Sequence, residues 1–305
     1  MSNFPHLHGV FAAALTPLKS DYSVDLDAIP QLLGFLKSQG CHGALLLGTT
    51  GEGPSFSPSE RIEIYRVAVA FRQQNPGFRI LAGTGTPSLT ETIDLTRLAF
   101  EQGLDGVVTL PPYFYKKVSD DGLFAWFSAV IQQAVPSGGA ILGYHIPAVS
   151  GVGLSIDLLA RLKDAYPDRF AGLKDSTGDP EHARQLGARF GTDLLVYTGN
   201  DRLLSLALEN HASGCITAMA NIFSAGLRHI WNSYQDGTPK TADQDKITAR
   251  RLVVDKYPPA PSLLKALLHR QHGLPYWPVR PALLPSPEAV VSAALNELAA
   301  LEKCS

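Results

Sequence analysis

The 305-residue chain lacks several features that would place it outside the cytoplasm. It has only three cysteines, Cys41, Cys215 and Cys304, which are odd in number and far apart, so they favour a reducing compartment over a disulfide scaffold. No apolar run approaches the roughly 20 residues that cross a bilayer. Residues 1–8 do not combine a charged segment with an apolar one as a signal peptide does. We therefore expect a cytoplasmic protein without a membrane partner.

An excess of charge of one sign is also missing. Lysine and arginine number 26 against 28 aspartates and glutamates, which gives a net charge of -2, and no basic cluster stands out. This balance argues against nucleic acid or an anionic membrane surface as partner. The cysteines and histidines are scattered without the spacing of a zinc site, so no metal is expected.

Short apolar runs are abundant, and each precedes a stretch with helical spacing. Strands are expected at residues 10–15, 44–47, 79–82, 106–110, 140–144, 170–174, 194–198 and 214–218. Eight alternations of strand and helix predict a (β/α)8 barrel, a TIM barrel of the α/β class. A doubly wound open sheet is the alternative, but the first run is not followed by the glycine-rich loop typical of a dinucleotide site.

The remainder of the chain has helical spacing. We expect a (β/α)8 catalytic barrel over residues 1–223 and a C-terminal helical extension, residues 224–305, packed on that barrel. Residues 57–60 read Ser-Pro-Ser-Glu, which places a hydroxyl cap, a proline and an acidic residue at the start of one barrel helix.

Lys174 closes the apolar run 170–174 and is followed by the polar stretch 175–179. A run of this kind predicts a buried strand that ends at a loop. Burial disfavours an ammonium ion, and a neutral amine can attack a carbonyl group to form a Schiff base. The alternative is a strand-end lysine whose amine extends to water.

Other strand ends carry polar groups, and barrel active sites lie at the carboxyl ends of the strands. The second strand is followed by GTTGE at 48–52, where hydroxyls and free backbone amides suit a small carboxylate, with an ordinary glycine turn as the alternative. Tyr144 ends the fifth strand. Asn200 and Asp201 follow the seventh. We expect these groups to surround one site.

Four motifs occur in a characteristic order: GTTGE at 48–52, PPY at 111–113, YHIP at 144–147 and GLKD at 172–175. With these motifs, the chain resembles the pyruvate-dependent class I aldolases typified by dihydrodipicolinate synthase and N-acetylneuraminate lyase. The resemblance covers essentially the whole chain. It implies a barrel enzyme that needs no cofactor beyond a covalent imine, takes a 2-oxo acid such as pyruvate, and assembles as a homotetramer, a dimer of dimers.

The resemblance also implies roles for individual residues. Lys174 matches the imine-forming lysine, and Tyr144 matches the tyrosine that moves protons. Thr49 and Thr50 match the pair that holds the pyruvyl carboxylate and connects to that tyrosine. Further residues expected around the substrate are Gly48, Ile216, Ser176, Asn200 and Asp201. For the last three, contact with the distal part of a hydroxylated substrate competes with strand-end capping and turn chemistry.

Two positions depart from the synthase pattern. Val149 stands where dihydrodipicolinate synthases usually have an arginine for the second substrate's carboxylate, and an apolar side chain cannot replace a bidentate guanidinium. Phe114 stands where those synthases have a tyrosine contributed across a dimer interface. Tyr113 or Tyr115 could substitute for it. The segment 113–115 is an expected interface element, with core packing as the alternative.

The sequence therefore favours a Schiff-base aldolase that cleaves a 4-hydroxy-2-oxo acid to pyruvate and an aldehyde. The loop 48–55 resembles that of 2-keto-3-deoxy-sugar-acid aldolases, and Lys174-Asp175-Ser176 resembles the motif of 4-hydroxy-2-oxoglutarate aldolases. The alternatives are an enzyme of the dihydrodipicolinate synthase or N-acetylneuraminate lyase type, an imine-using dehydratase, and a non-catalytic pyruvate-binding regulatory protein.

Overall fold

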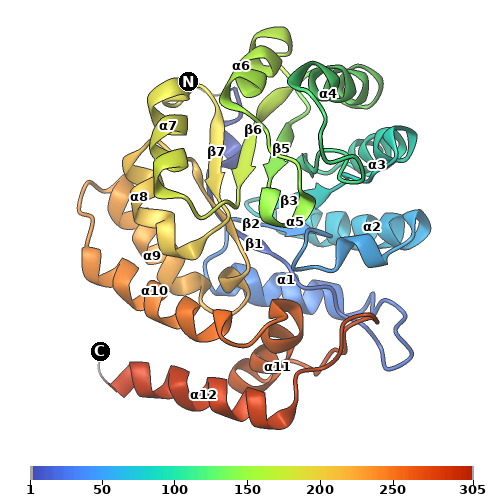
Figure 1. Cartoon of the computed structure of the whole chain (residues 1–305). Coiled ribbons are helices and arrows are strands. Elements are labelled where there is room, and N and C mark those ends of the chain that lie inside the picture. Colours follow the sequence, from blue (N-terminus) through green and yellow to red (C-terminus); the bar gives the residue numbers. More distant parts are fainter. Residues whose placement is uncertain (1–2, 304–305) are drawn as a thin grey trace.

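Eight parallel strands form a closed barrel in the order β1 to β8, in the computed structural model that describes residues 3–303. Figure 1 shows the strands inside a ring of helices. The predicted (β/α)8 barrel is confirmed. The strands are β1 Gly9–Ala13, β2 Gly43–Leu46, β3 Arg79–Gly83, β4 Gly106–Thr109, β5 Ile141–His145, β6 Phe170–Asp175, β7 Leu195–Thr198 and β8 Gly214–Thr217.

The helices follow the strands closely. They are α1 Ala28–Ser38, α2 Pro58–Gln74, α3 Leu89–Glu101, α4 Asp120–Ala134, α5 Pro147–Ser150, α6 Ile156–Ala165, α7 Pro180–Phe190, α8 Leu204–Glu209, α9 Ser224–Gln235, α10 Thr241–Asp255, α11 Ala260–His272 and α12 Glu288–Lys303. The expected start of α2 is confirmed, because Ser57 and Glu60 form a reciprocal capping box there. A helix after β6 was expected only from the alternation of strand and helix and not from its own residues, since α7 buries only Leu186, Gly187 and Phe190.

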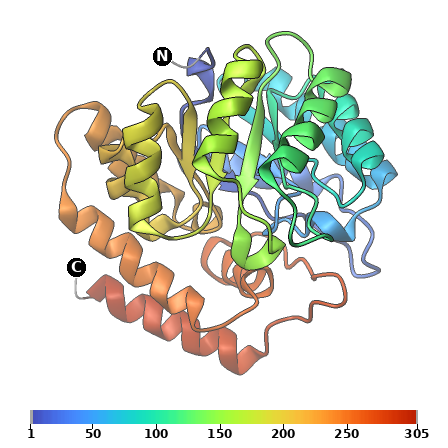
Figure 2. The same cartoon turned by 45° about the horizontal axis from the view of Figure 1, so that its top comes forward.

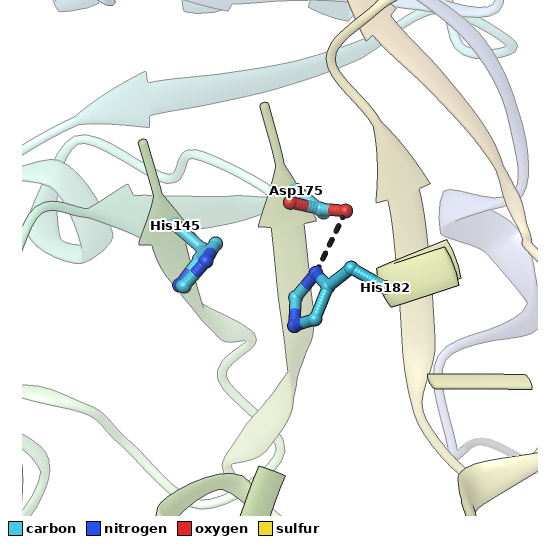
Figure 3. Close-up of side chains that lie close together, drawn as sticks. All are labelled: His145, Asp175 and His182. Atoms are coloured by element: carbon cyan, nitrogen blue, oxygen red, sulfur yellow. Dashed lines mark hydrogen bonds and ion pairs between the residues drawn. The ribbon is translucent and has the colours of Figure 1, made fainter. Parts of the chain in front are cut away.

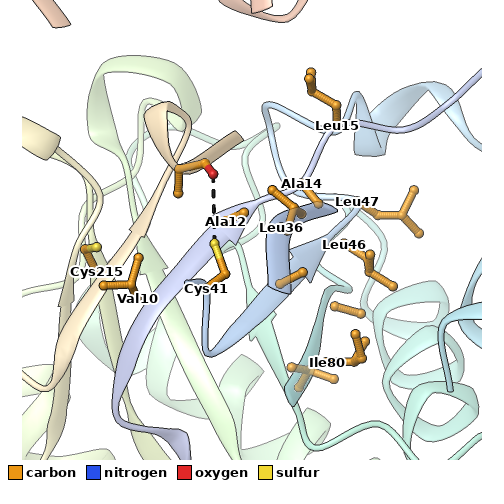
Figure 4. Packing of buried hydrophobic residues seen from close by; sticks show 14 of the residues in the cluster. Val10, Ala12, Ala14, Leu15, Leu36, Cys41, Leu46, Leu47, Ile80 and Cys215 are labelled. Carbon is orange, nitrogen blue, oxygen red and sulfur yellow. Dashed lines mark hydrogen bonds between the residues drawn. The ribbon is translucent and has the colours of Figure 1, made fainter. Parts of the chain in front are cut away.

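Apolar side chains fill two separate spaces, one inside the barrel and one between strands and helices. Phe11, Leu142 and Ile216 belong to the inner cluster. Figure 4 shows part of the outer cluster, in which Cys41 and Cys215 are buried. Burial raises the pKa of the Cys41 thiol to about 12 and that of Cys215 well above its usual range, so both thiols are poor nucleophiles. Cys304 lies outside the described residues.

The C-terminal helices divide into two parts. Helix α9 packs against β1 and α8, so the ring of barrel helices runs on through it. Helices α10 and α12 lie side by side, with α11 next to them, and Figure 2 shows the three below the barrel, on the side to which α5 projects. The domain boundary at residue 223 stays a prediction. No helix among residues 3–303 is long and apolar enough to cross a membrane.

Candidate active site

Lys174 and Tyr144 lie opposite each other on neighbouring strands, paired in the register of β5 and β6. Both side chains are buried, with exposed fractions of 3% and 4%. The lysine Nζ is 3.2 Å from the tyrosine Oη and 4.2 Å from the centroid of its ring. The structure therefore brings together the expected nucleophile and the expected proton carrier.

Thr49 completes a chain of polar groups with these two residues. Its Oγ1 lies 3.3 Å from the Tyr144 Oη. Burial by itself raises the pKa of Tyr144, but the charge of Lys174 and hydrogen bonds with Thr49, Lys174 and Ser176 outweigh burial and leave the pKa below its ordinary value. The phenol of Tyr144 therefore gives up its proton more readily than that of an ordinary tyrosine.

The loop that carries Thr49 and Thr50 is tightly folded. A Cβ added at Gly51 would lie 2.5 Å from the Ala14 carbonyl oxygen, and one at Gly53 would lie 1.9 Å from the Leu47 carbonyl oxygen. Only glycine fits such close backbone approaches. Within this loop Gly48 is buried, Thr50 is half-buried and Thr49 is exposed.

Arg61, from α2, places a buried guanidinium behind this loop. It donates hydrogen bonds to the backbone carbonyls of Gly53 at 2.6 Å, Gly83 at 3.1 Å and Phe56 at 3.2 Å. It also lines a cavity of about 30 Å³ beside Thr49 and Tyr144, with room for a water molecule or two. A fixed positive charge at this place favours an anionic group nearby.

The other expected site residues occupy different environments. Ser176 is half-buried and contributes to the lowered pKa of Tyr144. The side chain of Asn200 accepts a hydrogen bond from the Arg202 amide, so it caps the turn after β7. Ile216 is wholly buried in the inner cluster with Tyr144.

Asp201 is also wholly buried, and its carboxylate bonds to Arg251 of α10 at 2.6 Å. Burial raises the pKa of Asp201, and the charge of Arg251 opposes that rise. In this structure Asp201 links the barrel to the C-terminal helices, and Asn200 acts as a cap. Substrate contact by either residue stays a prediction.

Aromatic side chains stand out from the loop after β4. Phe114 and Tyr115 are 72% and 71% exposed and pack edge to face, with ring centroids 5.3 Å apart. Tyr113 is half-buried. Core packing, the alternative to an interface role for segment 113–115, therefore does not apply to Phe114 or Tyr115 in the single chain. Val149, on α5, is 64% exposed.

The residues that directly follow Tyr144 and Lys174 face the outside of the barrel and form a second cluster (Figure 3). His145, Asp175 and His182 place nitrogen and oxygen atoms within 4.8 Å of one another, a set of donor types from which metal sites are built. His182 Nδ1 is 3.1 Å from Asp175 Oδ2, and the two imidazoles stack with centroids 4.8 Å apart. The sequence analysis did not anticipate this cluster.

Hydrogen bonds define the state of the outer cluster. The Leu154 amide donates to His145 Nδ1 at 2.8 Å, so the proton of the neutral ring is on Nε2, and neither nitrogen then offers a free lone pair to an ion. Burial lowers the pKa of His145, reinforced by His182 and opposed by Asp175. The hydrogen bond to Asp175 raises the pKa of His182. In the cluster, His145 therefore stacks on the imidazole that is paired with Asp175.

Sequence reasoning missed three buried charges around the site: Arg61, Glu52 and Lys265. Lys265 bonds to Glu52 of the GTTGE motif at 2.6 Å. A signal was present for Lys265, because it is a single charge within the apolar run 263–268. A lysine in such a run is rarely buried without a partner. The partner, more than 200 positions away, could not be inferred from spacing.

Comparison with known proteins identifies the family of the chain. The sequence profile of the Dihydrodipicolinate synthetase family matches residues 6–299. An uncharacterised DapA-like lyase of Chloroflexus aurantiacus is 37% identical over 93% of this chain and 94% of its own. The 4-hydroxy-tetrahydrodipicolinate synthase of Corynebacterium urealyticum is 33% identical over 78% and 76%.

Solved structures agree as well. The crystal structure of dihydrodipicolinate synthase from Agrobacterium tumefaciens is 31% identical, covers 96% of this chain and 99% of that one, and superposes with a TM-score of 0.85. Profile, sequence and fold therefore point to the same family of lyases and aldolases. The chain belongs to the Dihydrodipicolinate synthetase family.

Proposed function

We propose that this protein is a class I aldolase that reversibly cleaves a 4-hydroxy-2-oxo acid to pyruvate and an aldehyde through an imine on Lys174. The observation that carries the proposal is the chain from buried Lys174 through buried Tyr144 to exposed Thr49, with Tyr144 Oη 3.2 Å from Lys174 Nζ and 3.3 Å from Thr49 Oγ1. A nucleophile within reach of a proton carrier is the arrangement that covalent catalysis on a carbonyl needs.

Imine formation is the first step. The neutral Lys174 amine attacks the C2 carbonyl carbon of the substrate, and Tyr144 gives its proton to the carbinolamine hydroxyl, which leaves as water. A protonated imine and the Tyr144 phenolate remain. Thr49, Thr50 and the backbone amides of their loop hold the C1 carboxylate, and the buried Arg61 behind that loop favours the negative charge. No other cofactor is required, since the imine itself accepts electrons.

Carbon–carbon cleavage follows. Tyr144, with its lowered pKa, accepts the proton of the C4 hydroxyl as the C3–C4 bond breaks. The aldehyde leaves, and the bonding electrons pass to the imine to give an enamine. Protonation at C3 and hydrolysis of the imine release pyruvate and free Lys174.

The favoured substrates are a 2-keto-3-deoxy sugar acid and 4-hydroxy-2-oxoglutarate. An exposed Val149 in place of the arginine that binds a second carboxylate weighs against the lysine-pathway synthase. That synthase remains the second candidate, because the curated relatives include proteins named 4-hydroxy-tetrahydrodipicolinate synthase. A neuraminate lyase, an imine-using dehydratase and a pyruvate-binding regulator rank below it.

A homotetramer is part of the proposal. Phe114 and Tyr115 are largely exposed in the single chain, and adjoining exposed aromatic rings are characteristic of surfaces that meet a partner. We expect this pair to be covered by a second copy in solution.

Incubation of pyruvate with a panel of aldehydes tests the activity, with proton exchange at the pyruvate C3 in deuterated water as a parallel measurement. The proposal predicts exchange with pyruvate alone and carbon–carbon bond formation with hydroxylated aldehydes or glyoxylate. Product formed only with aspartate semialdehyde would favour the synthase. Absence of exchange in folded protein would contradict aldolase function and favour a regulatory binder.

A further inference from the structure

Glu52, the last residue of the GTTGE motif, is enclosed by the C-terminal part of the chain. Its Oε1 is 2.6 Å from Lys265 Nζ of α11, and its Oε2 accepts the Arg280 backbone amide at 2.9 Å. The side chains of Glu52 and Lys265 are 0% and 1% exposed. Lys265 also donates to the Pro278 carbonyl at 2.6 Å. Both carboxylate oxygens are therefore bound by residues that follow the barrel.

Burying two charges costs free energy, so the presence of the Glu52–Lys265 pair needs an explanation. Removing two charges from water offsets most of their mutual attraction, and replacement by apolar groups is often neutral or stabilising. Burial lowers the pKa of Lys265, which expresses the same cost, although the charge of Glu52 opposes that change. Net stability is thus a weak explanation for the pair, and fixed geometry is a stronger one.

The backbone at Glu52 needs to be held. Its φ of +58° is left-handed, a conformation that disfavours residues other than glycine and persists where surrounding contacts enforce it. The same turn contains hydrogen bonds from the Glu52 amide to the Thr49 carbonyl at 3.2 Å and from the Gly53 amide to the Gly48 carbonyl at 3.0 Å. A shift of Glu52 therefore moves Thr49, whose hydroxyl is beside Tyr144.

The segment that contains Arg280 is itself held in place by the Arg280 side chain. The Arg280 guanidinium bonds to the carbonyls of Ser55 at 2.6 Å and Tyr22 at 2.8 Å, forms an ion pair with Glu60, and lies 4.4 Å from the centroid of the Phe56 ring. The segment that reaches Glu52 is thus fixed to the start of α2, next to the loop that it holds.

We propose that Lys265 is a positioning residue, which acts through Glu52 to hold the loop of Thr49 and Thr50 in the shape that binds the substrate carboxylate. The inference rests on the proposed function of that loop. It gives the C-terminal helices a direct part in the active site, since α11 supplies the lysine and the segment after it supplies the Arg280 amide.

Two carbonyl compounds separate positioning from general damage. Pyruvate carries the carboxylate that the loop would hold, whereas acetone does not, and both can form an imine with Lys174. The measurement is the concentration of each compound that gives half-maximal borohydride-reduced adduct on Lys174. Lys265→Met is expected to raise that concentration about tenfold or more for pyruvate and to leave it nearly unchanged for acetone.

A matched control and a milder variant complete the experiment. Arg270 is on α11, as Lys265 is, and forms an exposed ion pair with Glu288 of α12. Arg270→Met removes this pair and should leave the half-maximal concentrations of pyruvate and acetone unchanged. If Lys265→Met does not fold, Glu52→Asp takes its place, because a side chain about 1.5 Å shorter cannot reach Lys265 and the Arg280 amide without moving the turn. Glu52→Asp should also raise the half-maximal concentration for pyruvate and leave that for acetone nearly unchanged.

The outcomes are distinct. The positioning role would be overturned if folded Lys265→Met or Glu52→Asp protein kept the wild-type ratio of the half-maximal concentrations of pyruvate and acetone. The aldolase proposal would remain intact. An equal loss for both compounds would also overturn it, since that points to damage at Lys174. Absence of a pyruvate adduct in the wild-type protein would instead contradict the proposed function.

Discussion

The two faces of strands β5 and β6 differ in chemistry. Tyr144 and Lys174 face the barrel interior, and the next residues along the chain, His145 and Asp175, face the helices outside. Successive side chains of a strand point to opposite faces, so one position separates the two environments.

The difference lies in how charge is compensated. On the outer face, Asp175 accepts hydrogen bonds from the Thr177 amide and hydroxyl and pairs with His182, so its charge is satisfied locally. On the inner face, Lys174 Nζ contacts the hydroxyl and the ring of Tyr144, and within residues 3–303 no carboxylate forms an ion pair with it. A satisfied charge stabilises a fold, whereas an uncompensated amine is available to react.

The largest expected effect is at the inner face. Lys174→Ala should lower aldol turnover by at least about a thousandfold, because the variant lacks the amine that forms the imine. Circular dichroism and thermal unfolding should show an intact fold. Aldol activity close to wild type in this variant would remove the basis of the mechanism.

The second inner residue should give a smaller and more selective effect. Tyr144→Phe is expected to slow proton transfer by roughly a hundredfold or more and imine formation by much less, since the ring remains beside Lys174. Single-turnover borohydride trapping and C3 exchange measure the two steps separately. Equal losses in both steps would argue against a proton-transfer role.

The outer face should respond in stability more than in activity. Asp175→Asn removes the charge that pairs with His182 and is expected to lower the free energy of unfolding by about 1–3 kcal/mol, with activity within about tenfold of wild type. Urea unfolding measures the loss of stability, and the aldol assay measures the activity. A loss of activity as large as that of Lys174→Ala, in folded protein, would show that the faces are not chemically separate.

The smallest effect concerns pH. The hydrogen bond to Asp175 raises the pKa of His182, so this residue contributes stability that is fully present below the unfolded value near 6.5 and is lost as pH rises through the raised folded value. His182→Gln should therefore cost about 1 kcal/mol near pH 5.5 and much less near pH 9. A cost that grows with pH would contradict the ion pair.

The sequence predicted what depends on local pattern. Apolar runs located the eight strands, because a parallel strand buried on both faces is continuously apolar. The resemblance then identified Lys174, Tyr144 and Thr49, which the structure brings into contact. The residues of helix α7 did not themselves predict a helix, because this helix buries few apolar residues.

Contacts between distant segments were beyond the reach of the sequence pattern. Asp201 was expected near the substrate, but its partner Arg251 is 50 positions away. The bond between Lys265 and Glu52 spans 213 positions. The outer cluster was hidden for a similar reason, since only the pairing of β5 with β6 brings His145 beside Asp175. Such partners are set by tertiary structure rather than by spacing.

One measurement tests the central claim most directly: borohydride reduction in the presence of pyruvate, followed by intact-mass and peptide mass spectrometry. The inner-face account predicts one reduced pyruvyl adduct per chain, located on the peptide that contains Lys174 and absent from Lys174→Ala. No adduct in folded protein, or an adduct on another lysine, would contradict the assignment of Lys174 as the nucleophile.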